Sequence, residues 1–147
     1  MKQQIRYSHI VQYYETDQMK IVHHSNYIRW FEESRVAWMK KAGLQIEDLE
    51  EKGIIIPVVN VTCQYKNMTR FGEEVIVEPT VTKFNGVVIE FSYRIVEKTT
   101  GELKVTGTSS HCFIDKDYKV ISLKKKHPDI YERLLSEYQE FLEDKEI

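Results

Sequence analysis

The stretch HSNYIRWFEESRVAWMKK, residues 24–41, decides the fold. Its apolar side chains recur at steps of three and four residues, which predicts a helix with one wide apolar face. The centre of this face is Tyr27, Trp30, Phe31, Ser34 and Trp38, and it is widened by Ile28, Val36 and Met39. We expect Ser25 or Asn26 to cap the start of the helix and Gly43 to end it. A face this wide and aromatic predicts a helix that is buried against a sheet.

Strand patterns surround the helix. Residues 7–13 alternate before it, which predicts a short or edge strand, and residues 45–52 after it predict a second, short helix. Beyond that point the apolar period changes to two, and the expected strands cover residues 59–65, 75–81, 87–96, 103–114 and 118–121. Asn85-Gly86 is a strong hairpin turn signal. The pattern indicates an antiparallel meander.

A second amphipathic helix is expected at the C-terminus, opened by Pro128. Its apolar stripe consists of Ile130, Tyr131, Leu134, Leu135, Tyr138, Phe141 and Leu142. One long early helix followed by a meander predicts an α+β fold, in which a curved antiparallel sheet wraps around the central helix. We see no repeat and no linker, so residues 1–147 are expected to form a single domain.

Composition excludes several classes of protein. The chain has 147 residues, a net charge of -2 and 41% hydrophobic residues, which argues against disorder and against a global attraction for nucleic acid or anionic membranes. We find no membrane-spanning or secretory segment. Two cysteines, Cys63 and Cys112, favour a reduced setting but leave one disulfide possible. We therefore expect a cytoplasmic protein that binds neither nucleic acid nor membranes.

A polar segment between the first strand and the long helix is the best candidate for chemistry. It places Glu15, Asp17, His23 and His24 within ten residues. A loop that enters a buried helix brings a carboxylate near backbone N–H groups at the positive end of the helix dipole, where a carbonyl can be polarised. The alternative is that these carboxylates are only polar residues of a turn and that the histidines are surface or core residues without a catalytic role.

Other sites have weaker signals. His23 and His24 lack the i, i+4 spacing of a zinc-binding helix, and the two cysteines do not form a CxxC pair, so no metal is expected. Phosphate-binding glycine motifs and the GxSxG elbow are absent from the sequence. His111 and Cys112 are neighbours in a predicted strand and must face opposite sides, so both are interpreted as packing residues.

The segment YETDQMKIVHHSNYIRWFEESR, residues 14–35, resembles the signature of hot-dog-fold acyl-CoA thioesterases of the 4-hydroxybenzoyl-CoA thioesterase type. That signature is an aromatic residue, an acidic segment ending in Asp, an apolar pair, then His or Tyr, and Asn-Tyr or Ser-Tyr at the start of the long helix. The later strands, including residues 65–77 and 108–115, also resemble the family. Relatives often have Gly where this chain has Lys20.

The resemblance implies an acyl-CoA thioesterase that needs no cofactor. Asp17 would be the catalytic carboxylate, acting as nucleophile on the thioester or as base toward water. The backbone N–H of His24 would be the oxyanion donor, and Tyr14 would help to position Asp17. Asn26 and Tyr27, at the start of the helix, are expected to contact substrate.

Coenzyme A carries its phosphates at one end, so a few basic residues at the mouth of the site are enough to bind them. The candidates are Lys66, Arg70 and Lys83, with residues 124–126 as weaker ones. The resemblance also implies a homo-oligomer, a dimer or a tetramer, in which two sheets join edge to edge and the site lies at their interface.

Two other functions remain open at this point. A hot-dog module without catalysis would bind acyl-CoA or acyl carrier protein as a sensor. A hot-dog dehydratase or hydratase would need a His and a carboxylate around a β-hydroxyacyl group, which the Asp-then-helix motif fits less well. The sequence leaves the preferred acyl group undetermined.

Overall fold

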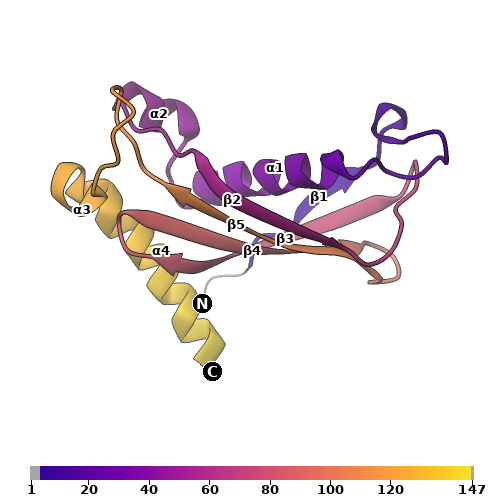
Figure 1. Cartoon of the computed structure of the whole chain (residues 1–147). Helices are drawn as coiled ribbons and strands as arrows, with labels where there is room; N and C mark the ends of the chain where they lie inside the picture. The colour runs from indigo at the N-terminus through magenta and orange to yellow at the C-terminus, as the bar shows by residue number, and fades with distance from the viewer. Residues whose placement is uncertain (1–3, 147) are drawn as a thin grey trace.

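The computed structural model describes residues 4–146 and contains one curved antiparallel sheet (Figure 1). The strands follow the order β1-β3-β4-β5-β2, so β1 and β2 form the two edges. Their bounds are β1 Tyr7–Ile10, β2 Val58–Tyr65, β3 Glu74–Phe84, β4 Val88–Glu97 and β5 Leu103–Cys112. The predicted edge strand is confirmed over Tyr7–Ile10, and the predicted meander is confirmed for β3, β4 and β5. The meander is wrong for β2, which pairs with β5 and not with the next strand in sequence, β3.

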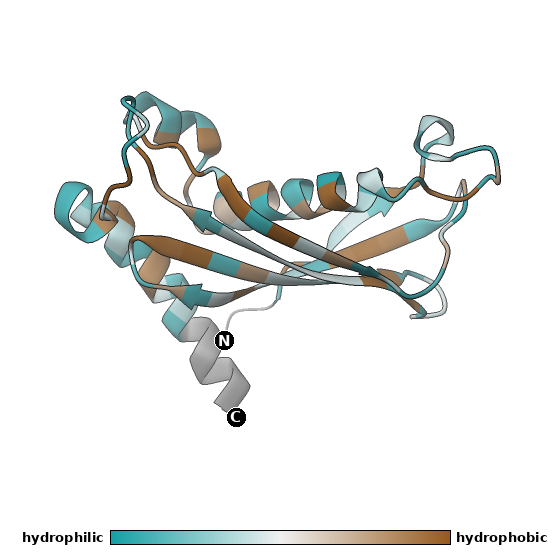
Figure 2. Ribbon diagram, viewed as in Figure 1, coloured by the Kyte–Doolittle hydropathy of each residue, from teal (hydrophilic) through white to brown (hydrophobic). Residues whose placement is uncertain are grey.

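The helix α1, Ser25–Lys41, lies along one face of this sheet (Figure 1). Trp30, Phe31 and Ser34 are fully buried there, and the core continues into apolar side chains of β3, β4 and β5. Figure 2 shows that hydrophobic residues lie mainly along the strands and on parts of α1, while α2 and α3 are largely hydrophilic. The expected α+β architecture, a sheet curved around a central helix, is confirmed.

Three further α-helices and a 3-10 helix, η1 Tyr13–Glu15, complete the fold. The α-helices are α2, Ile46–Glu51; α3, Leu123–Lys126; and α4, Pro128–Glu146. The α4 helix packs at the end of β3, where Tyr131 lies 5.6 Å from Phe84 between ring centroids and the Tyr138 hydroxyl donates to the Thr82 carbonyl at 3.4 Å. Ile130 and Leu134 are buried, as predicted, whereas the side chains of Phe141 and Leu142 lie outside the described residues.

Details of three sequence expectations are wrong. Residues 118–121 make an isolated bridge between Ile114 and Val120 instead of a strand, because Tyr118 adopts a positive φ of 63° and the chain turns away. His24 stands at the N-cap of α1, and neither Ser25 nor Asn26 caps it. Ile28 and Val36 are 39% and 45% exposed instead of buried, and Val36 borders a cavity between α1, α2 and the sheet.

The close contact between α1 and the sheet depends on a glycine. The Phe31 ring stacks on Tyr93 with 4.2 Å between centroids, and it also lies over Gly107 in β5. A Cβ added at Gly107 would meet the Phe31 ring and the Thr62 carbonyl at 2.6 Å, which is far inside van der Waals contact. The glycine is therefore required for the approach of the helix.

We expect Gly107→Ala to lower the free energy of unfolding by about 1–3 kcal/mol, the usual cost of overpacking a core. Urea unfolding followed by circular dichroism measures it. Ser110→Ala is the matched control, since residue 110 lies on the opposite face of the same strand, and its change should stay within about 0.5 kcal/mol. Equal stability of Gly107→Ala and wild type would contradict this account of the helix contact.

Candidate active site

The loop that carries Asp17 is a tight turn closed by backbone hydrogen bonds. Thr16 and Val22 form an isolated bridge, and the Asp17 N–H donates to the Ile21 carbonyl at 2.8 Å. Lys20 sits in the left-handed region with φ of 65°, a conformation that favours glycine. This explains why glycine suits the position, and it shows that the turn also forms with lysine.

The Asp17 carboxylate is half-buried at the mouth of this turn. One of its oxygens, Oδ1, accepts a hydrogen bond from the Met19 N–H at 2.8 Å. Within the described residues, no hydrogen bond or ion pair occupies the other carboxylate oxygen. An oriented carboxylate with one free oxygen can attack a carbonyl or take a proton from water.

The buried side chain of Glu15 holds the Asp17 turn in place. Its buried carboxylate accepts hydrogen bonds from His9 Nε2, the Gln12 N–H and Trp30 Nε1, each at 2.8 Å. Burial raises the pKa of Glu15, but these hydrogen bonds lower it by more. The pKa of Glu15 therefore lies below its ordinary value. Glu15 is therefore a structural anion inside the molecule and not a surface decoration of the turn.

The same residue ties the Asp17 turn to the start of α1. The Glu15 carbonyl accepts hydrogen bonds from the His23 N–H at 2.8 Å and from Asn26 Nδ2 at 2.9 Å. The next amide, that of His24, has no acceptor among the described residues. A free N–H at the positive end of a helix of 17 residues can stabilise a developing oxyanion.

Side chains at the helix start form an aromatic group. The rings of His23 and His24 lie 4.1 Å apart between centroids with a tilt of 31°, and the Tyr65 hydroxyl donates to the His24 carbonyl at 3.3 Å. Tyr27 is 3% exposed and its hydroxyl donates to Thr69 Oγ1. Tyr14 is 81% exposed, and no hydrogen bond joins it to Asp17 in the described part of the chain, so its positioning role stays a prediction.

The basic candidates for phosphate contacts fall into two groups. Arg70 forms a backbone bridge with Ile21 in the Asp17 turn, and Lys66 is four residues before it. Lys83 lies near the far end of β3. It is nine residues, or about 30 Å of strand, from Glu74, which begins β3 four positions after Arg70. One subunit therefore brings Lys66 and Arg70 to the Asp17 end, but not Lys83.

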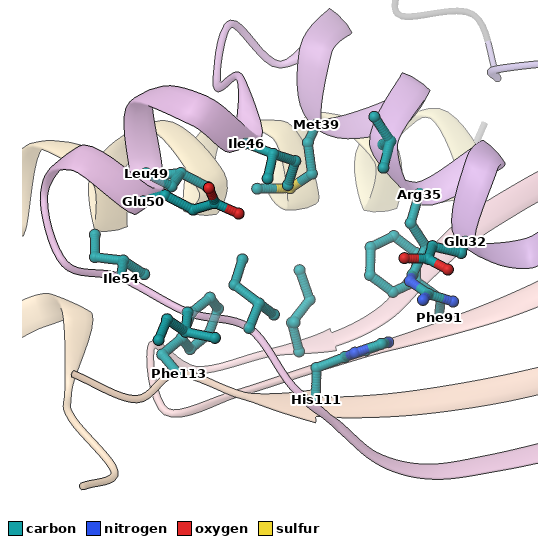
Figure 3. A pocket seen from close by; sticks show the side chains of 14 residues that line it. Glu32, Arg35, Met39, Ile46, Leu49, Glu50, Ile54, Phe91, His111 and Phe113 are labelled. Carbon is teal, nitrogen blue, oxygen red and sulfur yellow. The ribbon is translucent and has the colours of Figure 1, made fainter. Parts of the chain in front are cut away.

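A cavity of about 240 Å³ opens at the other end of α1 (Figure 3). Most of its lining is apolar and comes from α1, α2, the segment before β2, and strands β4 and β5; Met39, Ile54, Phe91 and Phe113 are examples. Glu32, Arg35 and His111 gather at one end of it, as Figure 3 shows. A mostly apolar cavity with a few polar groups is the usual form of a small-molecule site.

A chain of hydrogen bonds leads from Arg35 into the core beneath this cavity. Arg35 Nη1 contacts the Tyr93 hydroxyl at 3.1 Å, that hydroxyl lies 2.5 Å from Ser109 Oγ, and Ser109 Oγ lies 2.8 Å from His111 Nε2. His111 also hydrogen-bonds the Pro57 backbone, which has only a carbonyl to offer.

The contact with Pro57 determines which group donates in each of these hydrogen bonds. The ring N–H of His111 at Nδ1 donates to that carbonyl, so Nε2 accepts from Ser109. Ser109 then accepts from Tyr93, and Tyr93 from Arg35. Every polar atom in this series of hydrogen bonds therefore has a partner, and the remaining N–H groups of Arg35 can donate to another acceptor.

The buried His111 predicts a loss of stability in mild acid. Burial and the nearby Arg35 charge lower its pKa from 6.5 to about 4. Between those two pH values the unfolded chain binds a proton that the folded chain does not, so stability falls as the pH falls from 6.5 toward 4. We expect this group alone to remove about 2 kcal/mol between pH 7 and pH 5.

Urea unfolding at both pH values tests this expectation. His111→Gln should show a shallower pH dependence than wild type, whereas the exposed control His23→Gln should keep the wild-type dependence. Parallel curves for wild type and His111→Gln would contradict it.

Sequence reasoning missed the second group of polar residues. It interpreted His111 as a packing residue, although Ser109 and His111 are two positions apart in a strand and therefore share a face. That spacing is the only local signal, since Arg35 and Tyr93 join the chain through tertiary contacts. Both cysteines are free. Among the described residues, no group of three or more His, Cys, Asp or Glu side chains is placed to hold a metal, and no helix could span a membrane.

Comparisons with known proteins show the family and the fold of this chain. A family model described as Thioesterase-like superfamily matches residues 11–136. The "Putative acyl-CoA thioesterase YneP" of Bacillus subtilis (strain 168) is 40% identical over 120 residues, which cover 81% of this chain and 86% of that protein.

Solved structures show the same architecture. A DHNA-CoA thioesterase from Staphylococcus aureus superimposes with a TM-score of 0.89 and 32% identity, covering 97% of this chain and 95% of that one. The protein SAV2348 from Staphylococcus aureus, solved in complex with CoA, has a TM-score of 0.84 over 96% of this chain and 87% of its own, but only 14% identity, so it shows the fold alone.

Proposed function

Because this chain belongs to the thioesterase-like superfamily, we propose that it hydrolyses the thioester of an acyl-CoA to a carboxylic acid and free CoA. The observation that carries this proposal is the pairing of a carboxylate with a helix start. Asp17 and the free His24 N–H belong to one hydrogen-bonded unit, because the Glu15 carbonyl connects the turn to α1. Relatives named as acyl-CoA and DHNA-CoA thioesterases support the reaction class.

The reaction follows from this arrangement. With the thioester oxygen held by the His24 N–H, Asp17 either takes a proton from water as hydroxide adds to the carbonyl carbon, or adds to that carbon itself. In both routes the C–S bond breaks and the CoA thiolate leaves. In the second route water then cleaves the anhydride between the acyl group and Asp17.

Oxygen-18 water can reveal the anhydride route. After a single turnover, mass spectrometry finds label in Asp17 when water cleaves the anhydride at the Asp17 carbonyl, whereas direct attack by water on the thioester labels only the product acid. The roles of Asn26 and Tyr27 in binding, and of Lys66 and Arg70 near the CoA phosphates, belong to the same proposal. A cytoplasmic location also stays a prediction.

The sheet edge at β2 supports a homodimer. Val58 and Val59 are 51% and 65% exposed, although Val61 and Cys63 of the same strand pack on the core. Ile28 and Val36 expose apolar surface on α1 as well. A long edge strand with exposed apolar residues needs a covering partner, and a second copy of β2 can supply it through antiparallel pairing about a two-fold axis.

A hydrolysis panel tests the proposed function. Short, long and aromatic acyl-CoAs are offered, and release of free thiol and of the carboxylic acid is measured separately. We expect equal amounts of both products from at least one class. Release of neither product across the panel would contradict the proposal.

A further inference from the structure

We propose that Lys104, a buried residue of β5, is a positioning residue of the candidate active site and holds the Asp17 turn in its reactive geometry through residues 66–73. These residues join β2 to β3 and are called the connecting segment below. The inference rests on the proposed thioesterase function, because it names a residue on which the chemistry at Asp17 depends. Lys104 lies far in sequence from the segment 14–35 that carries the helix-entry motif.

Lys104 is a cation inside the protein. Its side chain is only 4% exposed, and lysine is almost never buried this deeply unless it is paired. The Nζ atom donates to the Met68 carbonyl at 2.8 Å and to the Glu102 carboxylate, and it lies 3.3 Å from Glu73 Oε2. Burial lowers the pKa of Lys104, but its bonds to Glu102 and Glu73 raise that pKa by more, so the side chain keeps its charge.

Most of these contacts hold the connecting segment. At the start of the segment, the Lys104 carbonyl accepts the backbone N–H groups of residues 66 and 67, at 2.9 and 3.1 Å. In its middle, Nζ binds the Met68 carbonyl. At its end, Glu73 Oε1 accepts the Arg70 N–H at 3.0 Å while Oε2 faces Nζ. The main chain and side chain of one residue therefore fix the segment at three points.

The connecting segment in turn holds the Asp17 turn. Thr69 is fully buried, and its carbonyl accepts the Val22 N–H at 2.8 Å. Arg70 forms the backbone bridge with Ile21, whose carbonyl accepts the Asp17 N–H at 2.8 Å. Figure 1 shows the turn and the connection between β2 and β3 at the same end of the sheet. The position of the Asp17 carboxylate therefore depends on the position of the connecting segment.

The connecting segment also contacts the start of α1. Thr69 Oγ1 accepts a hydrogen bond from the Tyr27 hydroxyl at 3.1 Å, and Tyr27 lies in the first turn of the helix, three residues after His24. A shift of the segment therefore moves the carboxylate relative to the proposed oxyanion donor. Because a displacement of about 1 Å at a reacting group costs about 100-fold in rate, even a smaller shift lowers kcat measurably.

A role in stability alone predicts a different result. A residue that only stabilises the fold changes the fraction of folded molecules, and the molecules that stay folded keep the wild-type kcat. A positioning residue lowers kcat in the folded protein, and its loss frees the backbone amides that its contacts hold in place. Kinetics and hydrogen exchange separate the two roles.

The kinetic experiment removes the ammonium and keeps the length of the side chain. In folded Lys104→Met we expect kcat to fall by about 10- to 30-fold. Glu102→Gln is the matched control, because Glu102 also binds Nζ, but within the described residues no hydrogen bond or ion pair joins it to the connecting segment. It should keep kcat within about threefold of wild type. A kcat for Lys104→Met in that same range would overturn the inference.

A double-mutant cycle tests the route through Glu73. Glu73→Gln replaces one carboxylate oxygen with an amide donor, so the side chain can no longer accept from the Arg70 N–H and pair with Lys104 together. Because both single variants break the same connection, the double variant Lys104→Met/Glu73→Gln should lose about as much kcat as Lys104→Met alone. Losses that multiply would show two independent effects and overturn the route.

Hydrogen exchange followed by NMR reports the turn itself. In Lys104→Met and in Glu73→Gln, the Asp17 and Val22 amides should exchange at least about tenfold faster, because their acceptors lose support. The Ile114 amide, which donates to the Ile55 carbonyl beyond the other end of β5, should keep its rate. Unchanged exchange at Asp17 and Val22, or an equal rise at Ile114, would overturn the inference.

The two proposals fail separately. Wild-type hydrolysis with an unchanged kcat in folded Lys104→Met contradicts the role of Lys104 and leaves the thioesterase function standing. Wild type that cleaves no acyl-CoA contradicts the proposed function, and exchange at Asp17 and Val22 still decides whether Lys104 holds the turn. If Lys104→Met does not fold, Glu73→Gln carries both measurements with the same expected directions.

Discussion

Asp17→Asn should lower kcat for acyl-CoA hydrolysis by about a thousandfold while leaving the fold intact. Asparagine keeps an oxygen that can accept the hydrogen bond from the Met19 N–H, so the turn retains its local structure. It has no negative charge to attack a carbonyl or accept a proton. The free energy of unfolding should therefore change by less than about 0.5 kcal/mol.

Steady-state thiol release and urea unfolding measure these two effects. Asp115→Asn is a matched control, because Asp115 also accepts backbone N–H bonds in a turn, from Asp117 and Lys119. It should keep wild-type kcat. A kcat for Asp17→Asn within threefold of wild type would remove Asp17 from the chemistry.

Glu15→Ala should affect both stability and activity. Removing the carboxylate leaves the buried Trp30 Nε1 and the Gln12 N–H without their acceptor. His9 Nε2 loses its hydrogen-bond partner as well. We expect a loss of about 3 kcal/mol in the free energy of unfolding. The Asp17 turn also loses its support, and a displacement of about 1 Å at a reacting group costs about 100-fold in kcat.

The conservative variant separates support from chemistry. Glu15→Gln keeps one carbonyl oxygen for Trp30 or Gln12, so its stability and kcat should lie between those of wild type and Glu15→Ala. Tryptophan fluorescence reports the environment of Trp30 during unfolding. Wild-type stability in Glu15→Ala would contradict the role of Glu15 as an anchor.

Periodicity was sufficient for most of the fold because each element carries its own local signal. The stripe of α1 and the two-residue period of the strands are visible in the sequence. The errors arise where tertiary structure decides. Ile28 and Val36 match the helical stripe, yet both are more than a third exposed, and residues 118–121 form only an isolated bridge after the positive φ of Tyr118.

The candidate site shows the same contrast between residues with a local sequence signal and residues that only the fold brings together. Asp17 and His24 lie within one contiguous segment, so a resemblance over that segment was enough to single them out. Arg35, Tyr93, Ser109 and His111 come from one helix and two strands, and their hydrogen bonds exist only after folding. The burial of Glu15 also depends on Trp30, a full turn inside α1, which a local reading of the turn does not reveal.

The central claim is that this chain cleaves acyl-CoA with Asp17 and does not merely bind it. Single-turnover mixing of excess protein with acyl-CoA, followed by free-thiol release, tests it most directly, with Asp17→Asn in parallel. The account predicts stoichiometric thiol release by wild type, and binding of the same acyl-CoA by Asp17→Asn with release slowed by about a thousandfold. Saturable binding by wild type with no thiol release would instead identify a binding module, and equal release by both proteins would place the chemistry on another residue.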